Sequence, residues 1–516
     1  MAPAHSVAEA FRRLQAGDAA GALEAARGVL STDGANARAF LAEGIALRMA
    51  GKLAEAMSSL ARAQQLDPRD HAAAYEEGVV HHLQGKREMA LDCFDRSAAL
   101  RPEFFAAPFS AGIVNAELGR WDAAASCFRR VLQVQPGQAE ALLQLALALG
   151  RAGRHGEADA TFVQALATHP GHAAIIRAFG QYSAARGNFA RAASLFAEAM
   201  RVEPADEALP MYHAQCELIL GRWRSAWASY SRRASRRRFE RDAAAIGRPY
   251  AVPSLEAVRG RRIAVIAEQG LGDVLFFLRW APTLRAAGAA LEFVGEPRLH
   301  GLLARTSLFE RFGEPLPDEA TPILVADLPL LFPGLDPLGL APIPIAPLSD
   351  RVSAWQARLQ ALGPRPWIGT QWRAGTPRAA SDTALSKEVP VEALFPAIAG
   401  LRGTLFALQR GLRGDERELA TRAAGRVVHD LSAASDELED TLAVVSILDR
   451  HLAVSSTALH LAAAAGAAAD VLVPFPPEWR WRTSGESPWF PRMRVHRQGV
   501  DGDWSEALAS AARGAG

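Results

Sequence analysis

The stretch RIAVIAEQGLGDVLFFLRW, residues 262–280, predicts a strand, a glycine turn and a helix in succession. Residues 263–267 form a continuous apolar run, which is typical of a strand buried on both faces of a parallel sheet. Gly270 and Gly272 interrupt the run, and after Asp273 the apolar residues recur at helical spacing. Such a segment opens a βαβ unit, whose turn lies outside the carboxyl end of the strand and favours an anionic ligand.

The residues after this stretch continue the alternation of strand and helix patterns. A proline-rich crossover between residues 329 and 344 divides the pattern into two parts. We therefore expect two doubly wound α/β halves, residues 261–350 and 351–516, that face each other across a cleft. Besides residues 263–267, strands are expected at residues 291–294, 323–325, 367–370, 404–408, 427–429, 451–454 and 471–473.

The residues before this stretch, 1–234, repeat with a period of 34. Five registers of glycine, alanine, proline or large apolar residues keep this step. They are Gly17, Gly51, Gly85, Gly119, Gly153, Gly187 and Gly221; Ala22, Ala56, Ala90, Ala124, Ala158, Ala192 and Ala226; Pro68, Pro102, Pro136, Pro170 and Pro204; Leu60, Phe94, Phe128, Phe162, Phe196 and Tyr230; and Gly44, Gly78, Gly112, Ala146, Gly180 and Ala214.

This period matches the tetratricopeptide repeat, in which each unit is a helical hairpin. We expect the small residues to let the two helices approach closely and the large residue to fill the space between hairpins. Proline is expected to end the second helix of each unit. About seven such units form an all-α solenoid with a concave groove, which predicts a module that binds a peptide or protein.

A basic segment, SRRASRRRFERD at residues 231–242, joins the two regions and leads into a basic and proline-containing linker, residues 235–260. A run of arginines is usually a solvated surface, and here it could also cap the last repeat and dock onto acidic groups of the next domain. A phosphate- or nucleic-acid-binding role is the alternative, although no aromatic residues are interleaved to support it.

The composition excludes several classes of function. Lys and Arg number 57 against 56 Asp and Glu, so the net charge of +1 gives no reason to expect a nucleic-acid or membrane-surface partner. Cys93, Cys127 and Cys216 are widely separated and form no C-x-x-C motif, which argues against a disulfide framework or a zinc site. The N-terminus lacks the apolar segment of a signal peptide, and no uncharged apolar run reaches eighteen residues. We expect a cytoplasmic protein without membrane insertion.

Five motifs stand out in this chain: AEQGLGD at 267–273, LQRG at 408–411, SSTALHLAAAAG at 455–466, PEWRW at 477–481 and SPWFP at 487–491. They resemble the motifs of bacterial tetratricopeptide proteins fused to a glycosyltransferase. The α/β region is similar to the heptosyltransferase group of GT-B glycosyltransferases, and the resemblance extends over essentially the whole chain. It implies a GT-B fold in which the first half faces the acceptor and the second half holds a nucleotide sugar.

The resemblance implies that Asp273 is the general base that deprotonates the acceptor hydroxyl. It belongs to an acceptor-side turn that also contains Glu268, Gln269, Gly270 and Gly272. An inverting transfer needs one carboxylate at the attacking oxygen, and it needs no metal if cationic or N–H donors hold the diphosphate. An aspartate before a helix is also an ordinary N-cap, and Glu268 is an alternative base.

The resemblance places the donor at the second half. Lys387 is similar to the family's phosphate-contacting lysine, with a solvated surface lysine as the alternative. Ser455, Ser456 and Thr457 begin a helix, where hydroxyls can cap it and bind a phosphate, and His460 follows. The family usually has aspartate and threonine where this chain has Ser455 and Ser456, so a charge is missing from the expected site.

Further donor contacts are expected where two strands of the second half end. Gln371 and Arg373 flank Trp372 after one strand, and Gln409 follows the next. The alternative for His460 is a partly buried histidine whose hydrogen bonds are satisfied within the protein. The aromatic segment that contains Trp479, Arg480, Trp481 and Trp489 either closes the cleft or packs the C-terminal helices, and packing is favoured for the tryptophans.

These observations predict a protein glycosyltransferase that uses a nucleotide sugar and no metal or other cofactor. The repeats would recruit the polypeptide acceptor, and the resemblance suggests bacterial surface or flagellar proteins, with flagellin as one case. Two alternatives stay open. The first is a repeat scaffold whose glycosyltransferase region is inactive, which Ser455 favours. The second is a heptosyltransferase-like enzyme that acts on a glycolipid, although no basic amphipathic helix suggests a membrane.

Overall fold

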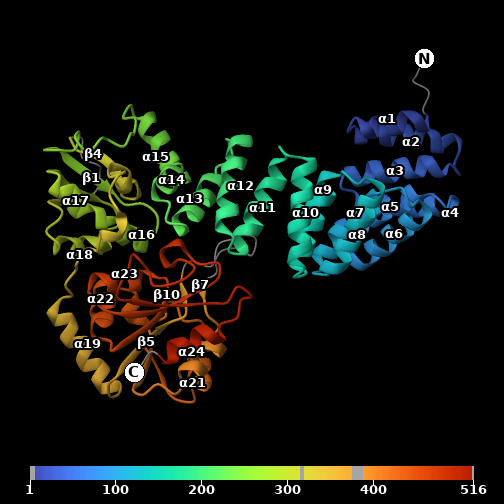
Figure 1. Ribbon diagram of the computed structural model, residues 1–516. Coiled ribbons are helices and arrows are strands. Elements are labelled where there is room, and N and C mark those ends of the chain that lie inside the picture. The colour runs from blue at the N-terminus through green and yellow to red at the C-terminus, as the bar shows by residue number, and fades with distance from the viewer. Residues whose placement is uncertain (1–5, 314–318, 375–386, 514–516) are drawn as a thin grey trace. The chain divides into compact units, whose positions relative to one another are not determined.

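The structure is a computed structural model that describes residues 6–313, 319–374 and 387–513. The chain divides into two compact units, Met1–Tyr182 and Ser183–Gly516. The first unit is entirely helical in its described residues, and the second combines the last helices of the repeat region with two parallel sheets. Figure 1 shows the order of these elements along the chain.

Helices in the repeat region follow one another as hairpins, with a short turn inside each pair. Those of the first unit are α1 (Val7–Gln15), α2 (Ala19–Thr32), α3 (Ala37–Met49), α4 (Leu53–Leu66), α5 (His71–Leu83), α6 (Arg87–Leu100), α7 (Ala106–Glu117), α8 (Trp121–Val134), α9 (Ala139–Arg151), α10 (His155–Thr168) and most of α11 (Ala173–Ala185). The second unit continues the series with α12 (Phe189–Val202), α13 (Leu209–Ile219) and α14 (Trp223–Tyr230). The pairs from α1–α2 to α13–α14 correspond to the seven repeats expected from the sequence.

The regular spacing of small residues along the repeats has two physical causes. Gly44 allows the close approach that was expected, because a Cβ at this position would lie 2.6 Å from the Cγ of Leu60 on the partner helix. For the register that contains Gly51, however, the expected cause is wrong. Gly51 lies in the turn inside the hairpin with φ of +75°, and a Cβ there would meet nothing within 4 Å. Backbone conformation, not helix contact, therefore requires glycine at that register.

The large apolar register packs both within a hairpin and against the next one. Leu60 lies on α4 against Gly44 of α3, within one hairpin. Phe162 on α10 stacks on Phe179 of the following hairpin, with 4.8 Å between ring centroids. The expected filling of the space between hairpins is thus confirmed for this residue. Pro68 lies just beyond the end of α4, as expected for a residue that cannot continue a helix.

The first sheet of the second unit has the strand order β3-β2-β1-β4, and its pairings are parallel. The strands are β1 (Arg262–Ile266), β2 (Ala290–Val294), β3 (Arg311–Phe312) and β4 (Thr321–Leu324). The helical segments around it are α16 (Leu271–Phe277), η1 (Leu278–Trp280), α17 (Ala281–Ala286), η2 (Pro297–Leu299), α18 (His300–Ala304), η3 (Val325–Leu331) and η4 (Pro337–Gly339). The opening strand, turn and helix predicted at residues 262–280 are confirmed.

The second sheet has the order β12-β11-β10-β5-β8-β9, again with parallel pairings. Its strands are β5 (Trp367–Gln371), β8 (Thr404–Ala407), β9 (Val428–Asp430), β10 (Arg450–Val454), β11 (Ala469–Val473) and β12 (Met493–Arg497). The short strands β6 (Arg373–Ala374) and β7 (Lys387–Glu388) form a separate antiparallel pair. The strand order reverses between β5 and β10, which is the topological switch point where α/β sheets bind ligands.

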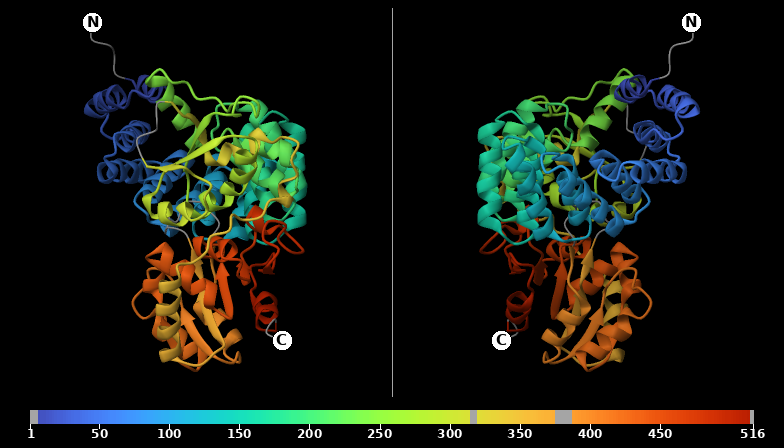
Figure 2. Two further views of the ribbon diagram at one scale, coloured as in Figure 1. Left: turned by 90° about the vertical axis from the view of Figure 1, so that its left-hand side faces the viewer. Right: turned by 90° about the vertical axis from the view of Figure 1, so that its right-hand side faces the viewer.

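Helices cover both faces of the second sheet (Figure 2). The hydrophobic core on one face includes residues of α19, α22 and α23, and the core on the other includes residues of α20, α21 and α24. The helical segments are α19 (Ser349–Leu362), α20 (Val391–Ile398), α21 (Glu416–Ala424), η5 (Ser432–Ser435), α22 (Leu438–Ile447), α23 (Thr457–Ala464), η6 (Trp479–Trp481) and α24 (Ser505–Arg513). The predicted pair of α/β regions with parallel sheets is therefore present.

The last repeat hairpin shares a hydrophobic core with the α/β region. Trp227 on α14 contacts the rings of Phe277, Trp280 and Trp479, each with about 6.0 Å between centroids. Trp223 at the start of the same helix meets Trp489 at 5.1 Å. The helix α14 thus packs against the segment after β1 of the first sheet and the segment after β11 of the second.

The basic segment after α14 is helical in part, because α15 (Ala234–Ala245) lies within residues expected to be a linker. Arg238 and Arg241 are exposed, as expected for a solvated surface. Arg233 is buried and pairs with Glu268 and Asp327, which confirms that this segment docks onto acidic groups of the next domain.

The three cysteines are buried and unpaired, as expected. Among the described residues, no helix is both long enough and apolar enough to cross a membrane. The same part of the chain contains no group of three His, Cys, Asp or Glu side chains that could hold a metal ion.

Candidate functional site

A cavity of about 710 Å³ lies where strands of both sheets end. One wall follows β1, and the other follows β5, β8 and β10 at the switch point of the second sheet. Most of the residues predicted to form the site line this cavity. They are Gly270, Gly272, Asp273, Gln371, Arg373, Lys387, Gln409, Ser455, Ser456, Thr457 and His460.

Asp273 lies in the first turn of α16 and faces an arginine of the opposite wall. The N-cap of α16 is Gly270, and no side chain caps the helix. The alternative of Asp273 as an N-cap is therefore wrong. Arg480 in η6 donates a hydrogen bond from Nη2 to Oδ1 of Asp273 at 2.5 Å. Arg480 is buried, whereas the Asp273 side chain keeps 32% of its exposure, so the carboxylate is held in place and still accessible.

Glu268 and Gln269 do not line the cavity, although both belong to the predicted turn. The carboxylate of Glu268 forms an ion pair with the buried guanidinium of Arg233. Gln269 has a φ of +67° and accepts a hydrogen bond at its Oε1 from the hydroxyl of Tyr230 at 2.9 Å. Because its carboxylate is engaged away from the cavity, Glu268 is a poorer candidate than Asp273 for a base.

The two walls approach most closely where Gly272 meets His460. A Cβ on Gly272 would lie 2.9 Å from the imidazole Cδ2 of His460, so only glycine fits here without a shift. Burial and then the charge of Arg480 hold the pKa of His460 well below its usual value. His460 is therefore neutral near pH 7, and its imidazole can act as a hydrogen-bond donor or acceptor without charge.

The hydroxyls at the start of α23 bind side chains instead of capping the helix. Ser456 occupies the N-cap position but makes no side-chain cap bond; its Oγ donates to Oε1 of Gln371 at 3.0 Å. Ser455 donates from Oγ to Oε2 of Glu478 at 2.9 Å. The expected capping by these hydroxyls is wrong. The first-turn N–H groups of α23 thus keep no side-chain cap, in the place where a helix favours an anion.

Glu478 is a site residue that the sequence analysis missed. It accepts the hydrogen bond from Ser455 and pairs with Lys387 at 2.8 Å and with Arg480. Burial alone would raise the pKa of Glu478, but Lys387 and Arg480 hold it well below the usual range. Glu478 therefore places a carboxylate beside Ser455, where the resemblance implied a missing charge. Its position in the PEWRW motif was the available signal.

Lys387 is not a solvated surface lysine. Its ammonium group lies 2.8 Å from Oε2 of Glu478, and 32% of its side chain is exposed. The same residue begins β7 and lines the cavity. Its position is consistent with a cation that faces the ligand from within a charge cluster.

Gln371, Arg373 and Gln409 connect the ends of β5 and β8. Gln409 Oε1 accepts hydrogen bonds from the backbone N–H groups of Trp372 and Arg373 at 3.1 and 2.9 Å. Gln371 Nε2 donates to the carbonyl of Leu408, and Arg373 forms an ion pair with Glu416. These side chains line the cavity, and their hydrogen bonds and ion pair are made with other groups of the protein at its floor. They fix the geometry of the switch point.

The lining of the cavity is strongly cationic. Within the part of the chain that the structure describes, six basic side chains and two carboxylates line it. Arg298, Arg410 and Arg413 were not predicted as site residues, although Arg410 lies inside the LQRG motif. The basic residues are Arg298, Arg373, Lys387, Arg410, Arg413 and Arg480, and the acidic residues are Asp273 and Glu478. This excess of positive charge favours an anionic ligand.

The tryptophans of the C-terminal aromatic segment pack in the core. Trp479, Trp481 and Trp489 are 6%, 1% and 1% exposed, and none of them lines the cavity. The favoured packing role is confirmed for these three residues. Arg480, which lies between two of them, is the residue of this segment that faces the cavity.

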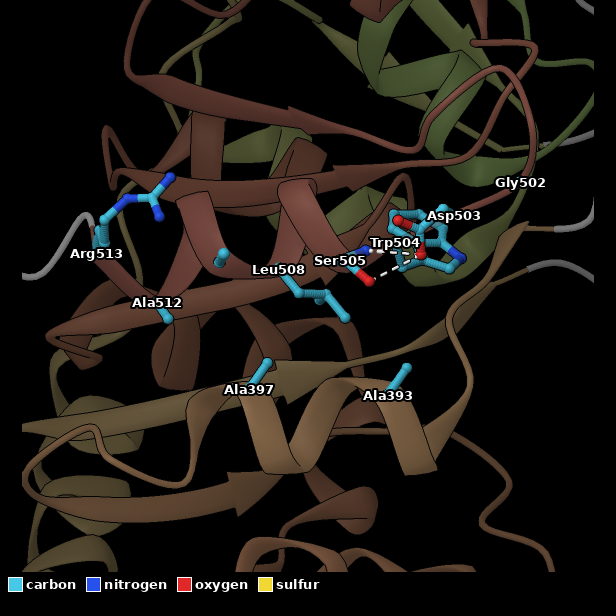
Figure 3. Close-up of a pocket in the computed structure, with 10 residues that line it drawn as sticks. Ala393, Ala397, Gly502, Asp503, Trp504, Ser505, Leu508, Ala512 and Arg513 are labelled. Carbon is cyan, nitrogen blue, oxygen red and sulfur yellow. Dashed lines mark hydrogen bonds between the residues drawn. The ribbon is translucent and has the colours of Figure 1, made fainter.

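A second cavity of about 620 Å³ lies between α20 and α24, away from the site (Figure 3). Ala393, Ala397 and Leu508 line it together with Trp504. Ser505 and Asp503 at one end hydrogen-bond each other. None of the predicted site residues lines this second cavity.

The helical part of the chain matches a known family of repeats. The model that describes the tetratricopeptide repeat matches residues 7–71, 75–139, 109–173 and 143–207. The helical array consists of tetratricopeptide repeats. Such repeats typically mediate binding of a peptide or protein. The resemblance of the α/β region to a glycosyltransferase stays a prediction.

One curated relative extends beyond the repeats. The chain is 24% identical over 329 residues to the protein FlbA of Caulobacter vibrioides (strain ATCC 19089 / CIP 103742 / CB 15). The match covers 57% of this chain and 52% of FlbA, so the chain spans about half the length of this relative. The two proteins are thus distant homologues.

Several solved structures are similar to parts of the chain. The crystal structure of MamA protein is 26% identical, covers 32% of this chain and 90% of its own, and has a TM-score of 0.29. YrrB, described as a tetratricopeptide-repeat protein with an unusual peptide-binding site, is 21% identical, with coverages of 36% and 96% and a TM-score of 0.33. A repeat protein from Parabacteroides merdae ATCC 43184 is 18% identical, with coverages of 44% and 89% and a TM-score of 0.35.

Proposed function

We propose that the protein is a glycosyltransferase of the GT-B type that moves a sugar from a nucleotide donor to a hydroxyl group of a polypeptide. The observation that carries this proposal is the cavity at the ends of both parallel sheets, where Asp273 faces a cationic wall. A nucleotide sugar needs cations for its diphosphate, and its transfer needs one base for the acceptor. Both kinds of group line this cavity.

The second half would hold the donor. Lys387, the rim arginines Arg410 and Arg413, and the uncapped first turn of α23 offer positive charge and N–H groups to a diphosphate. These groups would also stabilise the negative charge that develops on the leaving nucleoside diphosphate. His460 and the carboxylate of Glu478 lie beside them, where hydroxyl groups of the sugar can form hydrogen bonds.

The first half would activate the acceptor. Asp273 accepts the proton of the acceptor hydroxyl, whose oxygen attacks the anomeric carbon of the sugar. A new C–O bond forms as the bond to the diphosphate breaks, and the nucleoside diphosphate leaves with the electron pair. The accessible and fixed carboxylate of Asp273 supports this role, because a general base must be oriented toward the proton that it removes.

The tetratricopeptide repeats would recruit the polypeptide acceptor. Repeats of this kind form extended binding surfaces for peptides or proteins. A recruited chain is present at a high effective concentration near the cavity, so a weak sequence preference at the reacting residue suffices. Flagellin and other bacterial surface proteins are the first acceptors to test, since the sequence resemblance suggested them.

The test is an incubation of the protein with a panel of nucleotide sugars and acceptor polypeptides. Release of nucleotide and a mass increase of the acceptor equal to one sugar residue are expected for one donor. Asp273→Asn should lower kcat by about 10²- to 10⁴-fold, the usual contribution of a general base, with donor binding preserved. Asp350→Asn, at the start of α19, is the matched control. Full activity in Asp273→Asn would refute the role of Asp273.

An inactive scaffold is the second candidate. It is favoured by the ion pairs that Asp273 and Lys387 form within the protein, with Arg480 and Glu478. A scaffold predicts no turnover with any donor and no change in Tm on addition of nucleotides. A rise in Tm with one nucleotide together with transfer of its sugar excludes this candidate.

A further inference from the structure

The large register residue of the last repeat carries a hydroxyl group that its counterparts in the earlier repeats lack. Its large register residue is Tyr230, whereas the preceding units have Leu60, Phe94, Phe128, Phe162 and Phe196. The ring of Tyr230 is buried in the shared core, like the rings of the earlier units. Its hydroxyl reaches the α/β region and donates a hydrogen bond to Oε1 of Gln269 at 2.9 Å.

Gln269 lies in a backbone conformation that its residue type rarely adopts. Its φ is +67°, in the left-handed region that favours glycine. Such a conformation persists only where the surrounding structure holds it. The hydrogen bond from Tyr230 is a side-chain contact that can do this, and Gly270, the N-cap of α16, follows directly.

The neighbouring residue is held by the same repeat. Arg233, three residues after Tyr230, is 2% exposed and pairs with both Glu268 and Asp327. Asp327 belongs to η3, which follows β4, so one guanidinium joins the turn after β1 to the segment after the adjacent strand. Residues 268 and 269 are thus both anchored to the end of the repeat array.

We propose that Tyr230 and Arg233 of the last repeat are positioning residues for Asp273. They fix residues 268 and 269, and these set the direction in which the chain enters the first turn of α16. The inference rests on the proposed role of Asp273 as a base. It assigns to the tetratricopeptide array a second task, which is to hold the catalytic turn in addition to recruiting the acceptor.

Without the hydroxyl of Tyr230, Gln269 is free to leave the left-handed region. A change of φ at this residue rotates the first turn of α16 and moves the carboxylate of Asp273 from its place beside Arg480. Misplacement of a reacting group by about 1 Å can lower a rate about 10²-fold while substrate binding stays the same. The donor contacts lie on the second half, so the effect should appear in kcat and not in donor KM.

The test compares Tyr230→Phe with the matched control Tyr212→Phe, in the full-length protein. Tyr212 lies on α13 of the same hairpin and stacks on Phe196. Hydrogen exchange followed by mass spectrometry reports on residues 267–277. In Tyr230→Phe, exchange there should become about three- to tenfold faster, the change expected from loss of one hydrogen bond. It should remain unchanged in Tyr212→Phe.

Steady-state kinetics provide the second measurement. Tyr230→Phe should lower kcat about 10- to 100-fold with donor KM unchanged, and Tyr212→Phe should lower neither. Unchanged exchange at residues 267–277 in Tyr230→Phe overturns the proposal, as does faster exchange with an unchanged kcat. If the wild-type protein transfers no sugar from any donor, the proposed function fails, whereas the exchange measurement still decides whether the repeat holds the turn.

Discussion

Removal of the first five repeats should leave a folded protein, whereas removal of all seven should not. A chain that starts at His172 keeps α11 to α14 and therefore the hairpin that packs on the α/β region. A chain that starts at residue 235 loses this hairpin and Arg233. The two truncations thus test whether the last repeat belongs to the fold of the α/β region.

The expected cost of the longer deletion is comparable with the whole stability of a domain. Trp227 and Tyr230 are 7% and 5% exposed, and loss of each large aromatic side chain from a core costs about 3–5 kcal/mol. Loss of Arg233 leaves Asp327, which is fully buried, with weaker partners, and breaking a buried pair costs about 3–5 kcal/mol. The total of about 10 kcal/mol lies within the usual stability of about 5–15 kcal/mol.

Size-exclusion chromatography and thermal unfolding followed by circular dichroism are the assays. The chain from His172 should elute as a compact species and unfold cooperatively. The chain from residue 235 should aggregate or show no cooperative transition. A cooperative transition at the same Tm in both truncations would refute the reasoning, because the last hairpin would then contribute nothing to the core.

Three further predictions concern the site and its surroundings. Gly272→Ala should lower stability by about 1–3 kcal/mol in thermal melts and weaken nucleotide binding, because the added Cβ would lie 2.9 Å from the imidazole on α23. Gly270→Ala is the control: its Cβ would lie 3.4 Å from the nearest atom, so it should be tolerated in the same thermal and binding assays. Glu478→Gln removes the carboxylate that pairs with Lys387 and that shares Arg480 with Asp273, and it should cost about 3–5 kcal/mol. Inorganic pyrophosphate should restore part of this loss in thermal melts, whereas Glu439→Gln should show no such rescue. Burial lowers the pKa of His451 to about 4, below the value of about 6.5 in an unfolded chain. Between these two pH values the unfolded state binds a proton that the folded state does not, so stability falls as the pH drops from about 6.5 toward 4. His451→Leu should therefore remove about 2 kcal/mol of the stability loss between pH 7 and pH 5 in urea unfolding; an unchanged loss would contradict this cause.

The strands of the α/β region were largely predictable because most of them are buried apolar runs. The prediction at 263–267 differs from β1 by one residue at each end, and 367–370 lies within β5. Two strands of the parallel sheets were missed, and so was the short antiparallel pair β6 and β7. β3 has only two residues, and β12, with the sequence MRVHR, alternates apolar and polar residues at the edge of its sheet. Short and edge strands have no continuous apolar run to reveal them.

The sequence predicted those site residues that a local pattern within one segment indicates. Ser456 lies just after a predicted strand, and Asp273 follows another across the glycine turn. Parallel strands bring their carboxyl ends to one edge of a sheet. Arg298 reaches the cavity from η2, and Arg410 and Arg413 reach it from the segment between β8 and α21. The course of these segments depends on tertiary packing, so even Arg410, inside the LQRG motif, was not recognised as a site residue. Glu478 lay inside a quoted motif, but its role depends on its contact with Lys387, which is far away in the sequence.

At the boundary between the repeats and the α/β region, periodicity alone does not reveal that the last hairpin packs against the α/β region. Tyr230 keeps the period of 34, so the sequence assigns the last hairpin to the repeats. At the position of Trp227, however, the three preceding repeats have Ala193, Asp159 and Ala125. A terminal repeat that faced solvent would need a polar surface. The large tryptophan is instead buried against the α/β region, so it is the departure from the period that marks where the array docks.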